Sequence, residues 1–275
     1  MRCSVFLVVF LLAFSILGGA QDSDCASVDK SEDEIILTTK SWDPVLSIVR
    51  TLADHYGIGV SAEDPKWAFP IDTEDVAVAD PEFSAKHNDV HYRVMNRHVV
   101  QVRVSASENG LLKDLPVLLR QVSDAANKEM PYAYRLEVSG NDYILVPTRT
   151  RNPQGDLEDV QPLLDRHVSI PLGTRSIAEH ATLMADQLSQ QTGLHISCCQ
   201  SLVAGIPWGL AKVACEADDQ PARQVLRALI RVEPQANSEA PNRHPDFDHW
   251  TLGCDGTGAP WCFVEVEGKF TSRCR

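Results

Sequence analysis

Residues 167–197 read HVSIPLGTRSIAEHATLMADQLSQQTGLHIS, and this stretch decides the fold. A short apolar strand comes first, at 168–172. Ser176 and Glu179 then have the spacing of a capping box at the start of a helix, and Gly193 predicts its end. The helix has apolar residues spaced four, three and four apart, which places them on one face: Ile177, Ala181, Met184 and Leu188. A second strand is expected at 194–197.

The same pattern occurs earlier in the chain in a more diverged form. A strand at 35–37 and an apolar helical stripe precede Gly57, which lies 136 positions before Gly193. The match resumes at an offset of 111, where Leu118 corresponds to Leu229. Each copy closes with a predicted hairpin, at 134–148 and at 250–267. We interpret the two copies as an internal duplication.

The order of predicted elements gives an α+β fold. We expect two tandem small β-α-β-β-α-β-β modules, each a small sheet packed with two helices, at 35–148 and 167–268. Residues 149–166 mix charges with prolines and a glycine, so they are expected to be a linker.

The two ends of the chain are expected to lie outside the modules. Residues 1–20 are predicted to be a signal peptide, since a short apolar run ends in Gly18-Gly19-Ala20. An uncleaved anchor is the alternative, although the run is short for a membrane span. Residues 21–34 form an acidic leader, and 269–275 a basic tail. No later segment is apolar enough to span a bilayer, so no stable membrane span is expected after cleavage.

The composition predicts an ordinary globular protein that avoids polyanions. The chain is 44% hydrophobic and 23% charged, as folded proteins are. Its formal net charge of −13 disfavours nucleic acid and anionic lipid as partners.

Eight cysteines in an exported chain predict disulfides. Cys254 and Cys262 flank an obvious turn, so they are expected to face each other on a hairpin and form a bond. Cys215 is expected on a strand near Cys198 and Cys199, which suggests a second bridge. A metal site at these residues is disfavoured because adjacent cysteines point to opposite faces of a strand.

The first copy is longer than the second by 25 residues, which places an inserted loop at 62–98. Insertions into repeated modules fall on surface loops and often bind partners. Trp67, Phe69, His87 and His91 are therefore the candidate interaction surface, and a loop without a partner is the alternative. His87 and His91 lack the intervening glutamate of a zinc protease motif, so no metal site is predicted.

The second copy resembles a known family, the secretin and TonB short N-terminal domain. The resemblance covers about a hundred residues and rests on these segments in order: Ile170-Pro171, Gln191-Thr192-Gly193-Leu194, Leu202-Val203-Ala204-Gly205, the helix from Ala222 to Leu229, and the hairpin from Trp250 to Val266. The first copy keeps the apolar skeleton without these signatures. The resemblance implies a protein-interaction module of the cell envelope, with an envelope protein as its partner.

Three functions follow from these observations. The first is a non-enzymatic adaptor, assembly or signalling module in the periplasm or outside the cell, with no catalytic residues and no cofactor. The alternative is a glycan- or peptidoglycan-binding module, which needs two aromatic side chains on one exposed face. A metal- or thiol-dependent enzyme, the third hypothesis, needs His87, His91 and a carboxylate in one pocket.

Overall fold

A computed structural model describes the fold for most of the chain. It covers residues 25–30, 34–65, 70–87, 93–104, 115–140, 142–152, 154–198, 212–236, 247–255 and 261–268. The predicted signal peptide and basic tail lie outside these ranges.

The first half of the chain follows the predicted order of elements. It contains, in sequence, β1 (Ser27–Lys30), β2 (Ile35–Ser41), α2 (Pro44–Tyr56), β3 (Ser61–Glu63), β6 (His98–Val104), α6 (Leu115–Glu129), β7 (Ala133–Ser139) and β8 (Asp142–Arg151). In this half β2 pairs with β6, β3 runs parallel to β8, and β7 forms an antiparallel hairpin with β8.

The second half repeats this arrangement. It contains β10 (His167–Ser176), α7 (Ile177–Thr192), β11 (His195–Cys198), β12 (Lys212–Pro221), α8 (Ala222–Ala236), β13 (Phe247–Asp255) and β14 (Trp261–Gly268). Again the first and third strands pair antiparallel, the second runs parallel to the last, and the last two form a hairpin. Every strand pairing of the second half therefore has a counterpart in the first.

The first helix of each half ends at a glycine in the left-handed region. Gly57 has a φ of 62° and Gly193 a φ of 70°, values at which a side chain would be strained. At the other end of α7, Ser176 and Glu179 form both hydrogen bonds of the predicted capping box. Local sequence signals thus set the length of these helices.

The two halves share one sheet. β13 of the second half runs parallel to β3 of the first, which gives the strand order β11-β14-β13-β3-β8-β7. The lateral order is the same in both halves, while the strand directions are reversed. Two such half-sheets are related by a half-turn about an axis that lies in the plane of the sheet and perpendicular to the strands, together with a shift along that axis. This rotation keeps the lateral order, reverses the strand directions and exchanges the two faces of the sheet. The helices of the two halves must therefore cover opposite faces of the shared sheet.

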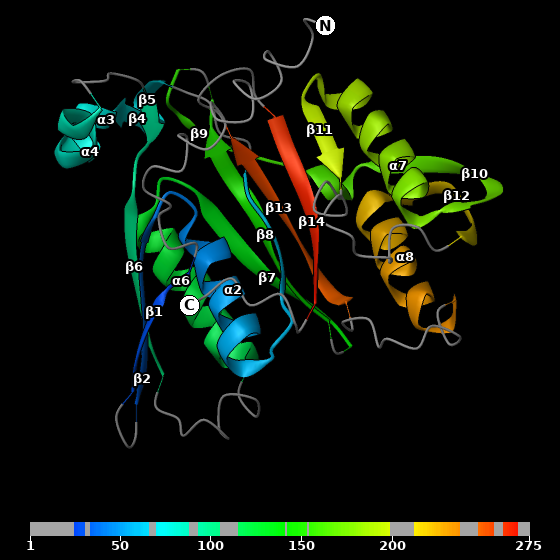
Figure 1. Cartoon of the computed structure of the whole chain (residues 1–275), viewed down its shortest axis with the longest axis horizontal. Coiled ribbons are helices and arrows are strands. Elements are labelled where there is room, and N and C mark those ends of the chain that lie inside the picture. The colour runs from blue at the N-terminus through cyan, green and yellow to red at the C-terminus, as the bar shows by residue number, and fades with distance from the viewer. Residues whose placement is uncertain are drawn as a thin grey trace, which may run out of the picture.

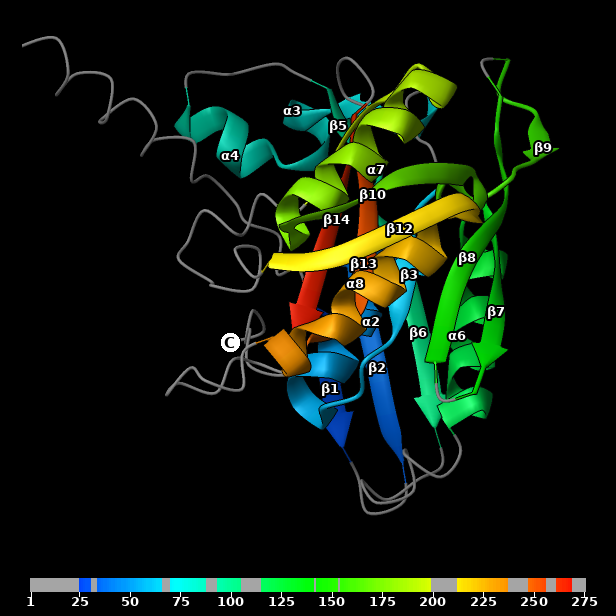
Figure 2. The same cartoon turned by 90° about the vertical axis from the view of Figure 1, so that its right-hand side faces the viewer.

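Figures 1 and 2 show this arrangement. α2 and α6 lie on one side of the central sheet, beneath an outer sheet of β1, β2 and β6. α7 and α8 lie on the other side, covered by β10 and β12. Buried apolar side chains of both halves form a single core cluster.

Residues 149–166 are more ordered than the linker that the sequence predicts. They contain β9 (Leu157–Asp159), which pairs with β8, and a 3-10 turn, η2 (Leu163–Asp165). Leu163 and Leu164 are buried, so this segment contributes to the core. The acidic leader is also partly structured, because β1 pairs with β2 and the amide of Ala26 donates to Thr51 Oγ1.

The insertion at 62–98 forms a small substructure of its own. It consists of η1 (Pro70–Asp72), β4 (Thr73–Asp75), α3 (Val76–Ala79), α4 (Pro81–Lys86) and β5 (Arg93–Met95), and β4 pairs with β5. Asp75 and Asp80 cap the two short helices with their side chains. In Figure 1 it stands at one end of the molecule, beside β6.

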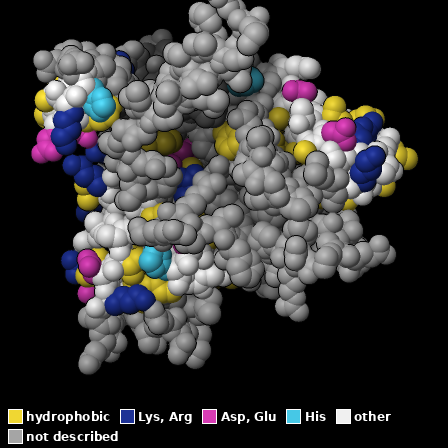
Figure 3. Space-filling model, viewed as in Figure 1, with side chains coloured by type: hydrophobic (Ala, Val, Ile, Leu, Met, Phe, Trp, Pro, Cys, Tyr) yellow, Lys and Arg dark blue, Asp and Glu magenta, His cyan; other side chains and the backbone are white. Residues whose placement is uncertain are grey.

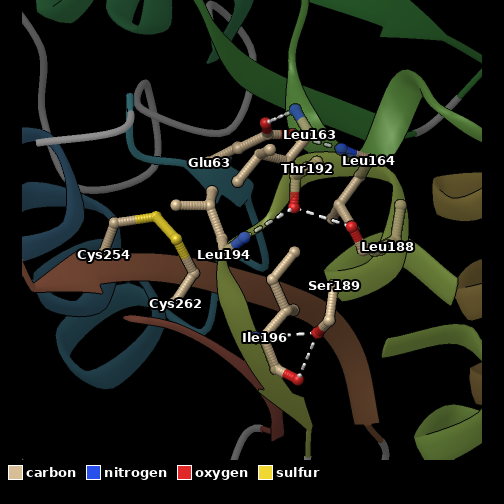
Figure 4. Close-up of a disulfide and its surroundings, with 10 residues drawn as sticks. All are labelled: Glu63, Leu163, Leu164, Leu188, Ser189, Thr192, Leu194, Ile196, Cys254 and Cys262. Atoms are coloured by element: carbon tan, nitrogen blue, oxygen red, sulfur yellow. Dashed lines mark hydrogen bonds between the residues drawn. A yellow bond between two sulfur atoms is a disulfide. The ribbon is translucent and has the colours of Figure 1, made fainter. Parts of the chain in front are cut away.

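The shared sheet ends at β11 because α7 occupies its outer edge (Figure 4). The amide of Ile196 donates to Ser189 Oγ at 2.9 Å, and the amide of Leu194 donates to Thr192 Oγ1 at 3.2 Å. The positions that match these two hydroxyls in the first half hold Ala53 and Tyr56. The corresponding edge of β3 thus lacks these caps, and it pairs with β13 instead.

Ser189→Ala tests this account of the edge. The substitution removes the acceptor for the Ile196 amide, so we expect the free energy of unfolding to fall by about 1–2 kcal/mol in urea titrations. The control is Thr182→Ala on the same helix, where the hydroxyl bonds only to a helical carbonyl. Equal losses for both variants would contradict a specific role of Ser189.

The disulfide between Cys254 and Cys262 is confirmed. The two residues are direct partners in the β13–β14 hairpin, and their Cα atoms are 4.1 Å apart. Both side chains are buried beside Leu194 and Ile196 (Figure 4).

Loss of this disulfide should destabilise the protein measurably. Closing a loop of this length contributes about 2–3 kcal/mol in the chain-entropy account. We expect the double variant Cys254→Ala, Cys262→Ala to lose at least that much in equilibrium unfolding, since it also leaves space in the core. A reductant also breaks the disulfides of Cys25 and Cys198, so it should destabilise the wild type more than the double variant, which has already lost the Cys254–Cys262 bond. Unchanged stability of the double variant would exclude a stabilising role for the bond.

Candidate functional site

A pocket, here called the junction pocket, lies where the two halves meet. It has a volume of about 560 Å³ and is bounded by α8 of the second half and by β3, β7 and β8 of the first. The pocket forms because α8 covers only the half-sheet of the second half. On this face the adjacent strands of the first half have no helix over them, since α2 and α6 lie on the opposite face. Ile144, Ile230 and Trp250 give the pocket an apolar lining, and its remaining walls are mostly charged.

Three arginines of α8 line the pocket: Arg223, Arg227 and Arg231. Their spacing of four residues places them along one face of the helix, and this face points toward the first half of the chain. Arg223 forms ion pairs with Glu137 of β7 and with Asp165 of η2. The row therefore ties α8 both to the neighbouring half-sheet and to the segment that connects the halves.

Arg227 and Arg231 share one carboxylate, that of Asp142 at the start of β8. Arg231 Nη2 lies 2.9 Å from Asp142 Oδ2. Burial and the neighbouring charge of Arg231 lower the pKa of Arg227. Two guanidinium groups on one carboxylate leave an excess positive charge at this end of the pocket.

Glu137 also pairs with two arginines, Arg135 and Arg223. Partial burial acts to raise its pKa, but hydrogen bonds from Arg135 and the charge of Arg223 outweigh burial and lower it. The side chain of Arg223 is largely buried while Arg135 is exposed. The pair with Arg223 is therefore the one least screened by solvent.

A buried carboxylate lies directly behind this polar row. Glu63, the last residue of β3, accepts hydrogen bonds from the backbone amides of Leu163 and Leu164 at the start of η2. Its side chain is buried, and burial raises its pKa to about 7 against the two amides and the charge of Arg223. Glu63 thus connects the central strand of the sheet to the chain between the two halves (Figure 4).

The next residue, Asp64, is buried on the opposite face of the sheet. It accepts a hydrogen bond from the hydroxyl of Tyr134 at 3.1 Å. Burial, and then the charge of Asp43, raise its pKa well above the ordinary value. Burial and the Asp64 carboxyl in turn raise the pKa of Tyr134. Two adjacent buried carboxyls therefore lie at the end of β3, the strand at which the halves join.

The raised pKa of Glu63 predicts how stability depends on pH. The folded protein binds the proton of Glu63 more tightly than the unfolded chain does, so stability is greatest below the ordinary pKa of 4.5 and falls as pH rises to about 7. The shift corresponds to about 3 kcal/mol. We expect Glu63→Gln to remove this part of the dependence in unfolding measured from pH 4 to pH 8.

The matched control is Glu158→Gln on β9, because Glu158 is exposed. It should leave the pH dependence of the wild type unchanged. A Glu63→Gln profile that runs parallel to the wild-type profile would show that Glu63 does not titrate in this window.

The structure assigns the predicted cysteines differently. Cys198 is disulfide-bonded, as is Cys25, and Cys199 lies outside the described residues. The bridge suggested for Cys215 is wrong, since Cys215 is a free thiol. The physical reason is topological: Cys215 lies on β12, which pairs with β10 in an outer sheet, whereas Cys198 ends β11 in the central sheet.

The predicted interaction surface is described only in part. His87 is exposed at the end of α4, where its ring centroid lies 4.4 Å from that of Phe83. Trp67, Phe69 and His91 lie outside the described residues. Among the tryptophans, Trp250 is buried and Trp42 is half-buried against the core. Within the described ranges no group of three His, Cys, Asp or Glu side chains could hold a metal ion.

Sequence reasoning missed the residues of the junction pocket. Arginines at 223, 227 and 231 are visible in the sequence as a basic row at helical spacing, on the side of the helix away from its apolar stripe. Nothing in the sequence pairs that row with Glu137 or Asp142, which lie about ninety positions earlier. Glu63 and Asp64 carry no local sign of burial either.

No protein-family model, curated protein or solved structure matches the chain. No helix among the described residues is long and apolar enough to cross a membrane.

Proposed function

We propose that this chain is an exported, non-enzymatic protein-interaction module of the cell envelope, in the periplasm or outside the cell. The observation that carries the proposal is the repeated β-α-β-β-α-β-β arrangement. It gives the first half the same strand pairings as the second, whose sequence resembles the secretin and TonB short N-terminal domain.

The cysteine chemistry supports export. Cys254 and Cys262 form a disulfide with each other, and Cys25 and Cys198 each take part in a disulfide as well. Stable disulfides form in oxidising compartments, which agrees with the signal peptide expected at residues 1–20. The proposal takes an envelope protein as the partner.

The surface of the insertion supports a binding role. Ile71 on η1 is 58% exposed and Val78 on α3 is 70% exposed, although both side chains are large and apolar. Figure 3 shows hydrophobic and charged side chains mixed over this part of the molecule, at the upper left. Apolar side chains displayed on a segment that one half has and the other lacks fit a contact with another protein.

A double substitution at this surface tests the proposal. We expect Ile71→Asp with Val78→Asp to weaken the complex with the envelope partner by about tenfold or more, because burying two aspartates in an apolar contact is unfavourable. The full chain would be cross-linked in the envelope of the producing cell and its partner identified by mass spectrometry. Affinity for that purified partner would then be measured.

The matched control is Leu172→Asp on β10, which changes a side chain that is 68% exposed on the other half. It should bind as the wild type does. Melting curves of all variants should coincide. A wild-type chain that forms no specific complex in its envelope would refute the proposed function.

A further inference from the structure

The two ends of the shared sheet differ. Its β11 end is closed by the hydroxyls of Ser189 and Thr192. Its other end is β7, and no described strand pairs with the outer edge of β7. An unpaired strand edge presents a row of backbone donors and acceptors to any chain that can lie beside it.

The direction of the backbone groups along β7 follows from its contacts. The amide of Tyr134 donates to Asn127 Oδ1 at 2.6 Å, and its carbonyl accepts from Ser123 and Asn127. These groups point away from β8 and are satisfied by α6. In an antiparallel strand the backbone amide and carbonyl of every second residue point to the same edge. Those of Leu136 and Val138 therefore point away from β8, as those of Tyr134 do. Neither has a described partner on that side.

Side chains along this edge offer both apolar and charged contacts. Val138 is 49% exposed. Glu137 and Ser139 line the junction pocket with side chains that alternate with Val138 along the strand, and Val138 itself lies at the pocket's edge. The charges on the face of Glu137 and Ser139 are four arginines, at 135, 223, 227 and 231, and three acids, at 137, 142 and 165. The excess charge on this face is therefore positive, and it lies where Arg227 and Arg231 share Asp142.

We propose that β7 binds an extended segment of a partner protein, which adds to the sheet as a strand through the backbone of Leu136 and Val138. One face of the segment presents an apolar side chain to Val138. Its other face presents an acidic side chain over the junction pocket, toward Arg227 and Arg231. The inference rests on the proposed function and names one of its contact modes.

A second copy of this chain fits the edge less well. If two β7 strands paired antiparallel through Leu136 and Val138 about a twofold axis, Glu137 would face Glu137 of the other copy. Like charges directly opposite each other in a sheet are destabilising. A partner strand with an acidic side chain set toward Arg227 and Arg231 avoids this conflict, because those two cations have one carboxylate between them.

The test uses a phage library of random twelve-residue peptides, selected on the purified full chain with its disulfides intact. We expect the recovered peptides to alternate apolar and polar residues and to be acidic. Val138→Pro removes the outward amide without removing a bond to β8, so we expect binding to weaken by about tenfold or more. Val138→Thr keeps the amide and the branched shape, and we expect it to bind like the wild type.

The charge contact has its own pair of variants. Arg231→Glu should weaken binding of the same peptides by about tenfold, whereas Arg120→Glu, an exposed arginine at the matching position of α6, should not. Recovery of no binding peptide, recovery of basic peptides, or equal binding by Val138→Pro and Val138→Thr would overturn the inference. So would a dimer in sedimentation that dissociates in Val138→Pro, since the occupant would then be a second copy.

The two proposals fail separately. If the envelope partner binds the wild type, Val138→Pro and Arg231→Glu equally, the β7 contact is refuted and the interaction function stands. If no envelope partner exists, the interaction function is refuted regardless of any peptide that binds β7. Circular dichroism and melting curves establish that each variant is folded before its affinity is interpreted.

Discussion

The parallel pairing of β13 with β3 fixes how the two halves of the molecule are arranged. Thr251 and Leu252 lie opposite Ala62 and Glu63, and the amide of Asp64 donates to the carbonyl of Leu252 at 2.8 Å. This short contact joins two half-sheets of reversed direction into one. Because of the reversal, the two helix layers cover opposite faces, and each layer ends beside a half-sheet that it does not cover. The junction pocket is a consequence of that offset.

The same junction explains why acidic groups are buried in an otherwise apolar core. Glu63 ends β3, and Asp64 continues its extended course by donating its amide to Leu252, so the two side chains point to opposite faces. Glu63 meets the free amides at the start of η2, and Asp64 meets the hydroxyl of Tyr134. A buried carboxyl is costly unless it is hydrogen-bonded, and each of these has a partner supplied by a different segment. The polar groups thus specify how the segments meet, and the apolar cluster around them contributes the larger part of the stability.

Differences between corresponding positions give the two halves distinct roles. Ser189 satisfies the outer edge of β11, while Ala53 at the matching position leaves β3 without such a cap. Arg223 and Arg227 line the pocket from α8, while Leu112 and Pro116 hold the matching positions of the first half. A sheet of two identical halves would keep one open edge of each kind, at its two ends, and would favour association end to end. These substitutions leave β7 as the unpaired end of the sheet among the described strands.

Local sequence patterns specify the repeated elements and their order. The spacing of apolar residues, the capping box at Ser176 and the glycines at 57 and 193 act within a few residues of the chain, so the helices and strands that the two halves share could be predicted. The bond between Cys254 and Cys262 was predictable for the same reason, since both lie on one hairpin.

How the halves join, and with it the candidate site, depends on contacts between segments far apart in the sequence. The pairing of β13 with β3 connects residues about 190 positions apart, and the β-strand pattern of each is compatible with several neighbours. For the same reason Cys215, expected beside Cys198, lies in another sheet, and residues 149–166, expected to be a linker, contribute Leu163 and Leu164 to the core. Local patterns specify what each segment becomes, whereas contacts between distant segments follow from which edges and faces remain unsatisfied once the elements have formed.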